Sequence, residues 1–124
     1  MSHIQDGIKQ IKENELKELL NENKSERIFI DVRELEEYDE FHIPGVPLMP
    51  MNTIPNYVSE LEQDKEYVFI CRSGGRSQNV ALYLKEQGFD KVINFNGGML
   101  SWTGEINQGP EWVVKSPGEL FGTK

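Results

Sequence analysis

The sequence predicts an α/β domain, in which helices cover both faces of a parallel sheet. Continuous apolar runs, such as residues 28–32 and 67–70, are typical of strands buried on both sides of a parallel sheet. Segments with helical periodicity stand between such runs, and this alternation of strands and helices favours a parallel sheet. The length of 124 residues suits one compact domain with its own core.

The first half of the chain is expected to contain two strands and three helices. The strands are the short apolar runs of residues 8–11 and 28–32. The helices are residues 14–20, 34–40 and 55–61. The first helix places its leucines on one face and has Asn14 as an N-cap. The second helix is acidic and is expected to face solvent, and the third accepts Pro55 in its first turn.

The second half continues the alternation around the only cysteine of the chain. The expected strands are residues 67–70 and 92–95, and the expected helices are residues 77–87 and 99–103. Gly88 is a natural C-terminal stop for the longer helix. Cys71 follows directly on a strand. Because ligands of parallel sheets bind at the carboxyl ends of the strands, Cys71 lies where a functional residue is expected.

The C-terminal residues fit this pattern less well. Residues 105–124 are rich in glycine, proline and polar side chains, yet they contain Trp112-Val113-Val114 and Leu120-Phe121. We therefore divide the chain into a domain of residues 1–104 and a tail of residues 105–124. We expect the tail to dock on the domain, because an exposed Trp-Val-Val would be unusual in a soluble monomer. A contact with a partner or a second copy is the alternative.

Charge and composition exclude several classes of function. The net charge of −8 argues against binding to nucleic acid or to anionic membranes. Residues 1–22 are dotted with charge and no apolar run approaches the ~20 residues of a spanning helix, so we expect a cytoplasmic protein. One cysteine permits no internal disulfide. With two distant histidines it predicts no metal site, and no cofactor is expected.

The segment of residues 71–77, Cys-Arg-Ser-Gly-Gly-Arg-Ser, carries the chemistry. Three features favour the thiolate of Cys71, which is the nucleophilic form of cysteine. The helix that begins near Ser77 presents its N–H groups and positive dipole end. Arg72 and Arg76 are always charged. The two glycines between them let the backbone curl, so that its N–H groups can converge on the sulfur.

The same groups are suited to bind an anion beside the sulfur. A cation about 4 Å from an anion contributes ~1 kcal/mol in water and ~4 kcal/mol at an effective dielectric constant near 20. Arg72 and Arg76 can therefore offset the diffuse repulsion from the net charge. An inert buried thiol and ordinary surface arginines are the alternatives. An inert apolar setting needs neither the glycines nor the arginines, so the reactive interpretation is favoured.

This segment resembles the active-site loop of the rhodanese (thiosulfate sulfurtransferase) homology domain. Two further signatures of that family occur in the right order: Asp31-Val32-Arg33, Glu37-Tyr38 and His42-Ile43-Pro44-Gly45 form the first, and Gly97-Gly98 with Trp102 form the second. The resemblance covers about residues 8–102, and Phe41 stands where the family often has glycine. It implies a single three-layer domain with a central parallel sheet of about five strands.

The resemblance also implies a two-step transfer of sulfur. Cys71 would attack the outer sulfur of a small anionic donor such as thiosulfate and then carry that sulfur as a persulfide. A thiophilic acceptor, such as cyanide, a cellular thiol or a thiol protein, would take it. The implied substrate-binding residues are Arg72, Ser73, Gly74, Gly75, Arg76 and Ser77. The arginines would hold the sulfonate end of the donor, and backbone N–H groups of residues 73–77 would stabilise the persulfide. Asp31, Arg33 and His42 would form a structural network.

Two other functions remain open at this point. Cysteine-dependent phosphatases and arsenate reductases place five residues between cysteine and arginine, commonly with histidine before the cysteine. Here four residues separate Cys71 from Arg76, and Ile70 precedes the cysteine. A persulfide carrier or redox-sensing module that binds a partner is the second alternative, and it would need an external thiol because the chain has no second cysteine. The physiological donor and acceptor, the pathway and the oligomeric state stay open.

Overall fold

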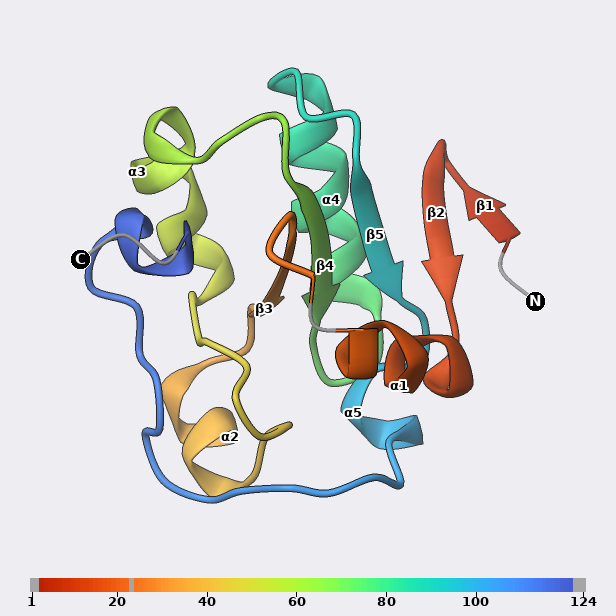
Figure 1. Ribbon diagram of the computed structural model, residues 1–124, viewed down its shortest axis with the longest axis vertical. Helices are drawn as coiled ribbons and strands as arrows, with labels where there is room; N and C mark the ends of the chain where they lie inside the picture. Colours follow the sequence, from red (N-terminus) through yellow and green to blue (C-terminus); the bar gives the residue numbers. More distant parts are fainter. Residues whose placement is uncertain (1–2, 23, 122–124) are drawn as a thin grey trace.

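The computed structural model describes residues 3–22 and 24–121, and its centre is a five-stranded sheet (Figure 1). The strands are β1 (His3–Gln5), β2 (Ile8–Ile11), β3 (Arg27–Asp31), β4 (Glu66–Ile70) and β5 (Val92–Phe95). Their order across the sheet is β1-β2-β5-β4-β3. Strands β2, β5, β4 and β3 run parallel to one another, which confirms the predicted α/β sheet. The edge strand β1 runs antiparallel to β2.

The sequence prediction misses β1. This strand forms a hairpin with β2, in which Gln5 pairs with Ile8 across a two-residue turn. The turn residues Asp6 and Gly7 have φ values of 54° and 82°, as a type I′ turn requires. Asp-Gly is a strong hairpin signal, so the sequence contained the information.

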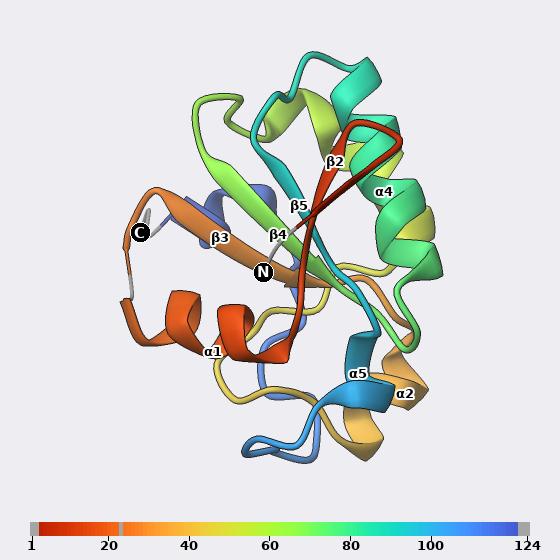
Figure 2. The ribbon, with the colours of Figure 1, turned by 90° about the vertical axis from the view of Figure 1, so that its right-hand side faces the viewer.

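The helices cover both faces of the sheet, with α1 on one side and α4 on the other (Figure 2). The helices are α1 (Glu13–Glu22), α2 (Leu35–Glu40), α3 (Ile54–Tyr57), α4 (Gly75–Glu86) and α5 (Gly98–Ser101). Three 3-10 helices are η1 (Met51–Thr53), η2 (Val58–Glu60) and η3 (Pro117–Phe121). The helix expected over residues 55–61 is thus a short α-helix between two 3-10 turns. Among the described residues, no helix combines the length and apolarity needed to cross a membrane.

Alternating side chains of the strands fill two cores. Tyr67 and Phe69 of β4 pack in one core together with Leu84 of α4. Val68 and Ile70 of the same strand face the other core. Both faces of β4 are therefore apolar, which explains its continuous apolar run. Each large side chain buried in this way contributes about 1.5–3 kcal/mol to folding.

The described part of the tail, residues 105–121, passes α2 and ends beside α3 (Figure 1). It makes backbone hydrogen bonds with the segment before η1: the Leu48 N–H donates to the Trp112 carbonyl at 2.8 Å, and the Val114 N–H donates to the Leu48 carbonyl at 3.0 Å. Val114 and Leu120 are buried in the core beside α4. A contact of the tail with a partner or a second copy stays a prediction.

Candidate active site

Cys71 lies at the carboxyl end of β4, where the chain turns into α4. Its side chain is buried, with 1% of its surface exposed. The backbone N–H of Gly74 donates a hydrogen bond to the Cys71 Sγ at 3.0 Å. Gly74 is the N-cap of α4 and has a φ of 100°, a left-handed conformation that favours glycine. A Cβ atom at Gly74 would lie 3.1 Å from the Gly97 nitrogen, so the close approach of two turns also favours glycine here.

The beginning of α4 provides further donors beside the sulfur. The helix begins at Gly75, two residues earlier than the sequence predicts, so its first turn directly follows the cysteine loop. The N–H groups of residues 75–77 have no acceptor among the described residues, as is normal for the first turn of a helix. The Gly74 N–H is the backbone donor that reaches Sγ. The expected convergence of the other N–H groups on a persulfide stays a prediction.

The turn between β5 and α5 is hydrogen-bonded to the backbone of the cysteine loop. The Met99 N–H donates to the Cys71 carbonyl at 2.8 Å, and the Leu100 N–H donates to the Arg72 carbonyl at 2.9 Å. Gly98 has a φ of 56°, and a Cβ atom at this position would lie 2.4 Å from the Cys71 carbonyl oxygen. The second glycine of the Gly97-Gly98 pair is therefore required by backbone packing against the cysteine loop.

A buried polar network lies behind Cys71. The Ser77 Oγ is 3.3 Å from the Cys71 Sγ and also makes a hydrogen bond with the Asn94 Oδ1. The Asn94 Nδ2 donates to the Gly74 carbonyl at 3.2 Å and to the Gln10 Oε1 at 2.8 Å. Asn94 and Gln10 are not among the site residues expected from the sequence. Their signal is a polar side chain inside an apolar strand, because such a residue needs buried hydrogen-bond partners.

The two arginines of the loop have different surroundings. Arg72 is exposed, whereas Arg76 forms a bidentate ion pair with Glu37 of α2, with both N···O distances at 2.8 Å. The hydrogen bonds from Arg76 lower the pKa of Glu37 to about 2. Glu37 raises the pKa of Arg76 in turn. Sequence patterns carry no signal for this pair, because Glu37 and Arg76 lie in separate segments. It uses two of the five N–H donors of Arg76, and binding of a sulfonate to the others stays a prediction.

Comparison with known proteins shows which family the chain belongs to. Residues 12–105 match the family model described as "Rhodanese-like domain". The chain belongs to the rhodanese-like family. A Bacillus subtilis protein named "Putative sulfurtransferase YtwF" is 52% identical over 98 residues, which cover 79% of this chain and 93% of that protein. "Thiosulfate sulfurtransferase GlpE" of Shewanella oneidensis is 34% identical over 83 residues, 67% of this chain and 81% of that protein.

A solved structure confirms the rhodanese-like fold. The crystal structure of a rhodanese-like domain protein from Staphylococcus aureus aligns with a TM-score of 0.72 and 36% sequence identity. The alignment covers 80% of this chain and 96% of that protein. A single domain with a mostly parallel five-stranded sheet is therefore shown, and the names of the relatives support a sulfurtransferase role in general terms.

The rhodanese-like signature around Asp31 forms a buried ion pair. The Arg33 Nε and Nη2 donate to the Asp31 carboxylate at 3.0 and 2.9 Å, and Nη2 also donates to the Phe41 carbonyl at 2.8 Å. The side chains of Asp31 and Arg33 are 1% and 2% exposed. The pair thus ties the end of β3 to the segment that follows α2.

His42 of the same signature connects α2 to the tail. Its ring stacks on that of Tyr38, with the ring centroids 3.8 Å apart. Its Nδ1 makes a hydrogen bond with the Tyr38 carbonyl at 2.9 Å, and its Nε2 lies 2.8 Å from the Glu111 Oε1. Glu111 also accepts the Gly45 N–H at 3.0 Å. Both ring nitrogens of His42 therefore have partners outside the cysteine loop. Sequence patterns had no signal for Glu111, which lies in the tail.

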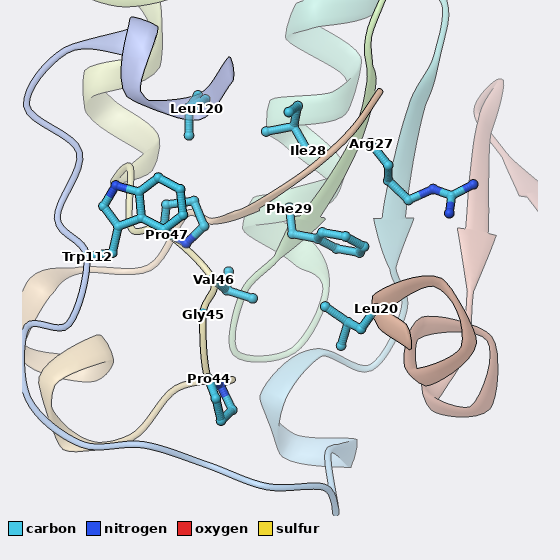
Figure 3. Close-up of a pocket in the computed structure, with 10 residues that line it drawn as sticks. All are labelled: Leu20, Arg27, Ile28, Phe29, Pro44, Gly45, Val46, Pro47, Trp112 and Leu120. Atoms are coloured by element: carbon cyan, nitrogen blue, oxygen red, sulfur yellow. The ribbon is translucent and has the colours of Figure 1, made fainter. Parts of the chain in front are cut away.

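A groove of about 260 Å³ lies away from this site, between α1, the edge strand β3 and the tail (Figure 3). Figure 3 shows Leu20 of α1, Phe29 of β3 and Val46 on one side of it, and Trp112 beside Pro47 on the other. None of the residues that line it belongs to the cysteine loop. The groove is therefore separate from the cysteine loop.

Proposed function

We propose that this protein is a sulfurtransferase, which moves a sulfane sulfur from thiosulfate or a persulfide donor to a thiophilic acceptor through a persulfide on Cys71. The observation that carries the proposal is the position of the Cys71 Sγ, 3.0 Å from the Gly74 nitrogen at the beginning of α4. A sulfur anion at a helix N-terminus is stabilised by the helix dipole and by the open N–H groups of the first turn. The names of the relatives support the same reaction class.

The proposed transfer has two balanced steps. The Cys71 thiolate attacks the outer sulfur of thiosulfate, a new S–S bond forms, and sulfite leaves with the electron pair of the old S–S bond. An acceptor thiolate or cyanide then attacks the outer sulfur of the persulfide, and the Cys71 thiolate is regenerated. Two easier steps thus replace one difficult transfer. Because the chain has one cysteine, the sulfur must leave to a group outside this chain.

The first turn of α4 is suited to hold the intermediate. The outer sulfur of a persulfide extends one S–S bond, about 2.0 Å, beyond the Sγ. The N–H groups of residues 75–77 lie in the first turn of α4, close in sequence to Cys71, and none has an acceptor among the described residues. Such preorganised donors stabilise a developing anion without reorganisation.

The test is to load the protein with sulfur. After incubation with thiosulfate, intact-mass measurement should show one added sulfur, and cyanide or dithiothreitol should remove it. Cys71→Ser is the matched control and should gain no sulfur. The proposal fails if the wild-type protein gains no sulfur from thiosulfate or from a small-molecule persulfide. It also fails if Cys71→Ser gains sulfur equally.

A persulfide carrier is the second candidate, and the pairing of Arg76 favours it. The Glu37 carboxylate neutralises Arg76, so Arg72 is left as the loop arginine without a carboxylate partner among the described residues. An incomplete site for a dianion suits a protein that receives sulfur from a persulfide better than one that turns over thiosulfate. Two rates distinguish the candidates: a carrier loads rapidly from a small-molecule persulfide but transfers sulfur from thiosulfate to cyanide slowly in the steady state.

A further inference from the structure

Glu37 of α2 lies beside the cysteine loop and is paired with one of its two arginines. We propose that Glu37 is a specificity-determining residue, which withholds Arg76 from the donor and so directs the site toward sulfur donors of low negative charge. The inference deepens the proposed function, on which it rests, because it names the class of donor that the site accepts best. That class is persulfides and monoanionic thiosulfonates rather than the thiosulfate dianion.

The backbone of α2 fixes the position of the Glu37 carboxylate. Glu37 is the third residue of the helix, and its Oε1 accepts the Glu34 N–H at 2.9 Å. Such a capping box holds the side chain against the first turn of the helix. The next residue, Tyr38, is fully buried, and its hydroxyl donates to the Val46 carbonyl at 2.5 Å. The helix therefore presents Glu37 to the loop in one orientation.

This fixed carboxylate occupies one edge of the Arg76 guanidinium. Nη1 and Nη2 of Arg76 donate to Oε1 and Oε2 of Glu37, both at 2.8 Å, in the bidentate geometry that suits a guanidinium best. The sulfonate end of thiosulfate presents oxygens of the same kind as a carboxylate, so it competes with Glu37 for this edge. A donor that arrives from solution must displace a partner that the capping box already holds.

The charges around the loop leave no positive excess for a dianion. Arg76 interacts electrostatically with the carboxylates of Glu37 and Glu34 and with Cys71. The other cation of the loop, Arg72, is exposed. Two carboxylates therefore offset two guanidinium groups, and the whole chain has a net charge of −8. Because the Coulomb energy is proportional to the charge of the donor, thiosulfate is disfavoured more than a monoanion.

Two donors of similar shape separate the effect of charge from that of chemistry. Methanethiosulfonate has a methyl group where thiosulfate has a charged oxygen, so it is a monoanion instead of a dianion. With either donor, the Cys71 thiolate attacks the outer sulfur and forms the same persulfide. The electron pair of the old S–S bond leaves with methanesulfinate or with sulfite. The ratio of the two loading rates therefore reports donor charge, because any change in the reactivity of Cys71 cancels.

The test measures sulfur loading from each donor by intact mass, as a function of time, in the wild-type protein and in Glu37→Gln. The variant removes the carboxylate and frees Arg76, so loading from thiosulfate should become about tenfold faster and loading from methanethiosulfonate about threefold faster. The ratio of thiosulfate to methanethiosulfonate loading should thus rise about threefold. An unchanged ratio overturns the proposal. A lower ratio also overturns it, because Glu37 would then orient Arg76 for the sulfonate.

Glu40→Gln is the matched control for this variant. Glu40 lies on the same helix, is exposed and forms no ion pair within residues 3–22 and 24–121. Its substitution removes the same formal charge, and the ratio of loading rates should stay close to that of the wild-type protein. A rise like that of Glu37→Gln would assign the effect to net charge instead of the pair and would contradict the proposal.

Arg76→Lys gives an independent test of sign. Lysine keeps the charge but lacks the planar fork, so Glu37 holds it less firmly. If Glu37 withholds Arg76 from the donor, the ratio of loading rates in this variant stays equal or rises. If Arg76 binds the sulfonate through its fork, the ratio falls and the proposal is overturned. This variant keeps Glu37 and stays decisive even if Glu37→Gln does not fold.

A failure of this inference is distinct from a failure of the sulfurtransferase proposal. If the wild-type protein gains sulfur from neither donor and from no small-molecule persulfide, the proposed function fails and the inference fails with it. If loading occurs and the ratio does not respond to Glu37→Gln, the inference alone fails.

Discussion

On its inner side the cysteine loop rests on buried groups, whereas its outer side faces solvent. On the inner side, Gly98 packs against the Cys71 carbonyl, and the buried Asp31–Arg33 ion pair lies at the end of the neighbouring strand β3. The outer side consists of Arg72, Ser73, Gly75 and the half-exposed pair of Arg76 with Glu37. Both sides contain a glycine and a bidentate arginine, so the same residue types occur in two environments.

This difference in burial indicates that the two sides of the loop have different roles, one in folding and one in use of the sulfur donor. A buried ion pair that loses one partner leaves a charge without solvation, and a backbone contact in the core cannot relax. Changes on the inner side should therefore affect folding first. Exposed groups are compensated by water, so changes on the outer side should affect the choice and use of the sulfur donor while the fold is kept.

The largest expected difference is between the two arginines. Arg33→Leu leaves the Asp31 carboxylate buried without its partner and should reduce the free energy of unfolding by about 3–5 kcal/mol. Arg76→Leu removes a half-exposed pair and should cost no more than about 1 kcal/mol. Urea denaturation of both variants at pH 7 measures the two costs. Equal costs would remove the distinction between the inner and outer sides.

The two glycines provide the next test. Gly98→Ala places a Cβ atom 2.4 Å from the Cys71 carbonyl oxygen and should cost about 1–3 kcal/mol, with loss of sulfur loading because the cysteine loop must move. Gly75→Ala is the matched control: a Cβ atom there meets no atom within 4 Å, and alanine favours a helix. Its stability should be unchanged or higher in thermal and urea denaturation. A larger cost for Gly75→Ala would contradict the comparison.

Acid should weaken the outer pair in a defined pH range. The pKa of Glu37 is about 2 in the folded protein, against 4.5 for the free side chain, because Arg76 stabilises the carboxylate. A lowered folded pKa contributes stability that is fully present above pH 4.5 and is lost as the pH falls toward 2.

The measurement is the free energy of unfolding between pH 7 and pH 3 for the wild-type protein and Glu37→Gln. The wild-type protein should lose up to about 1 kcal/mol more than the variant over this range, because solvent screens this partly exposed pair. Parallel pH curves for the two proteins would show that the pair of Glu37 with Arg76 contributes nothing to stability.

The smallest expected effect is that of Arg72, which is exposed. Arg72→Ala should raise the KM for thiosulfate about fivefold, as expected from one solvent-screened charge contact of about 1 kcal/mol, and should leave stability unchanged. Arg72→Lys should have a KM for thiosulfate close to that of the wild-type protein, because a point charge suffices at an exposed site. The prediction is wrong if the lysine variant behaves like the alanine variant.

Most elements of the fold were predictable because their signals are local. The apolar runs of β3, β4 and β5 and the leucine face of α1 indicated strands and a helix near the observed bounds. The hairpin of β1 was also signalled, by Asp6-Gly7, but was missed. At the site, the sequence placed Cys71 between a strand and a helix. It did not predict that Arg76 is paired with Glu37 or that Ser77 is bound to Asn94.

The sequence by itself determined the order of strands and helices, the position of the cysteine at a strand end and the family signatures, because these depend on patterns within a few residues. The tertiary structure alone decided the partners of the site residues. Glu37 and Arg76 are 39 positions apart, Ser77 and Asn94 are 17 apart, and His42 and Glu111 are 69 apart. Such pairs form only when packing brings distant segments of the chain together, so patterns within a few residues do not predict them.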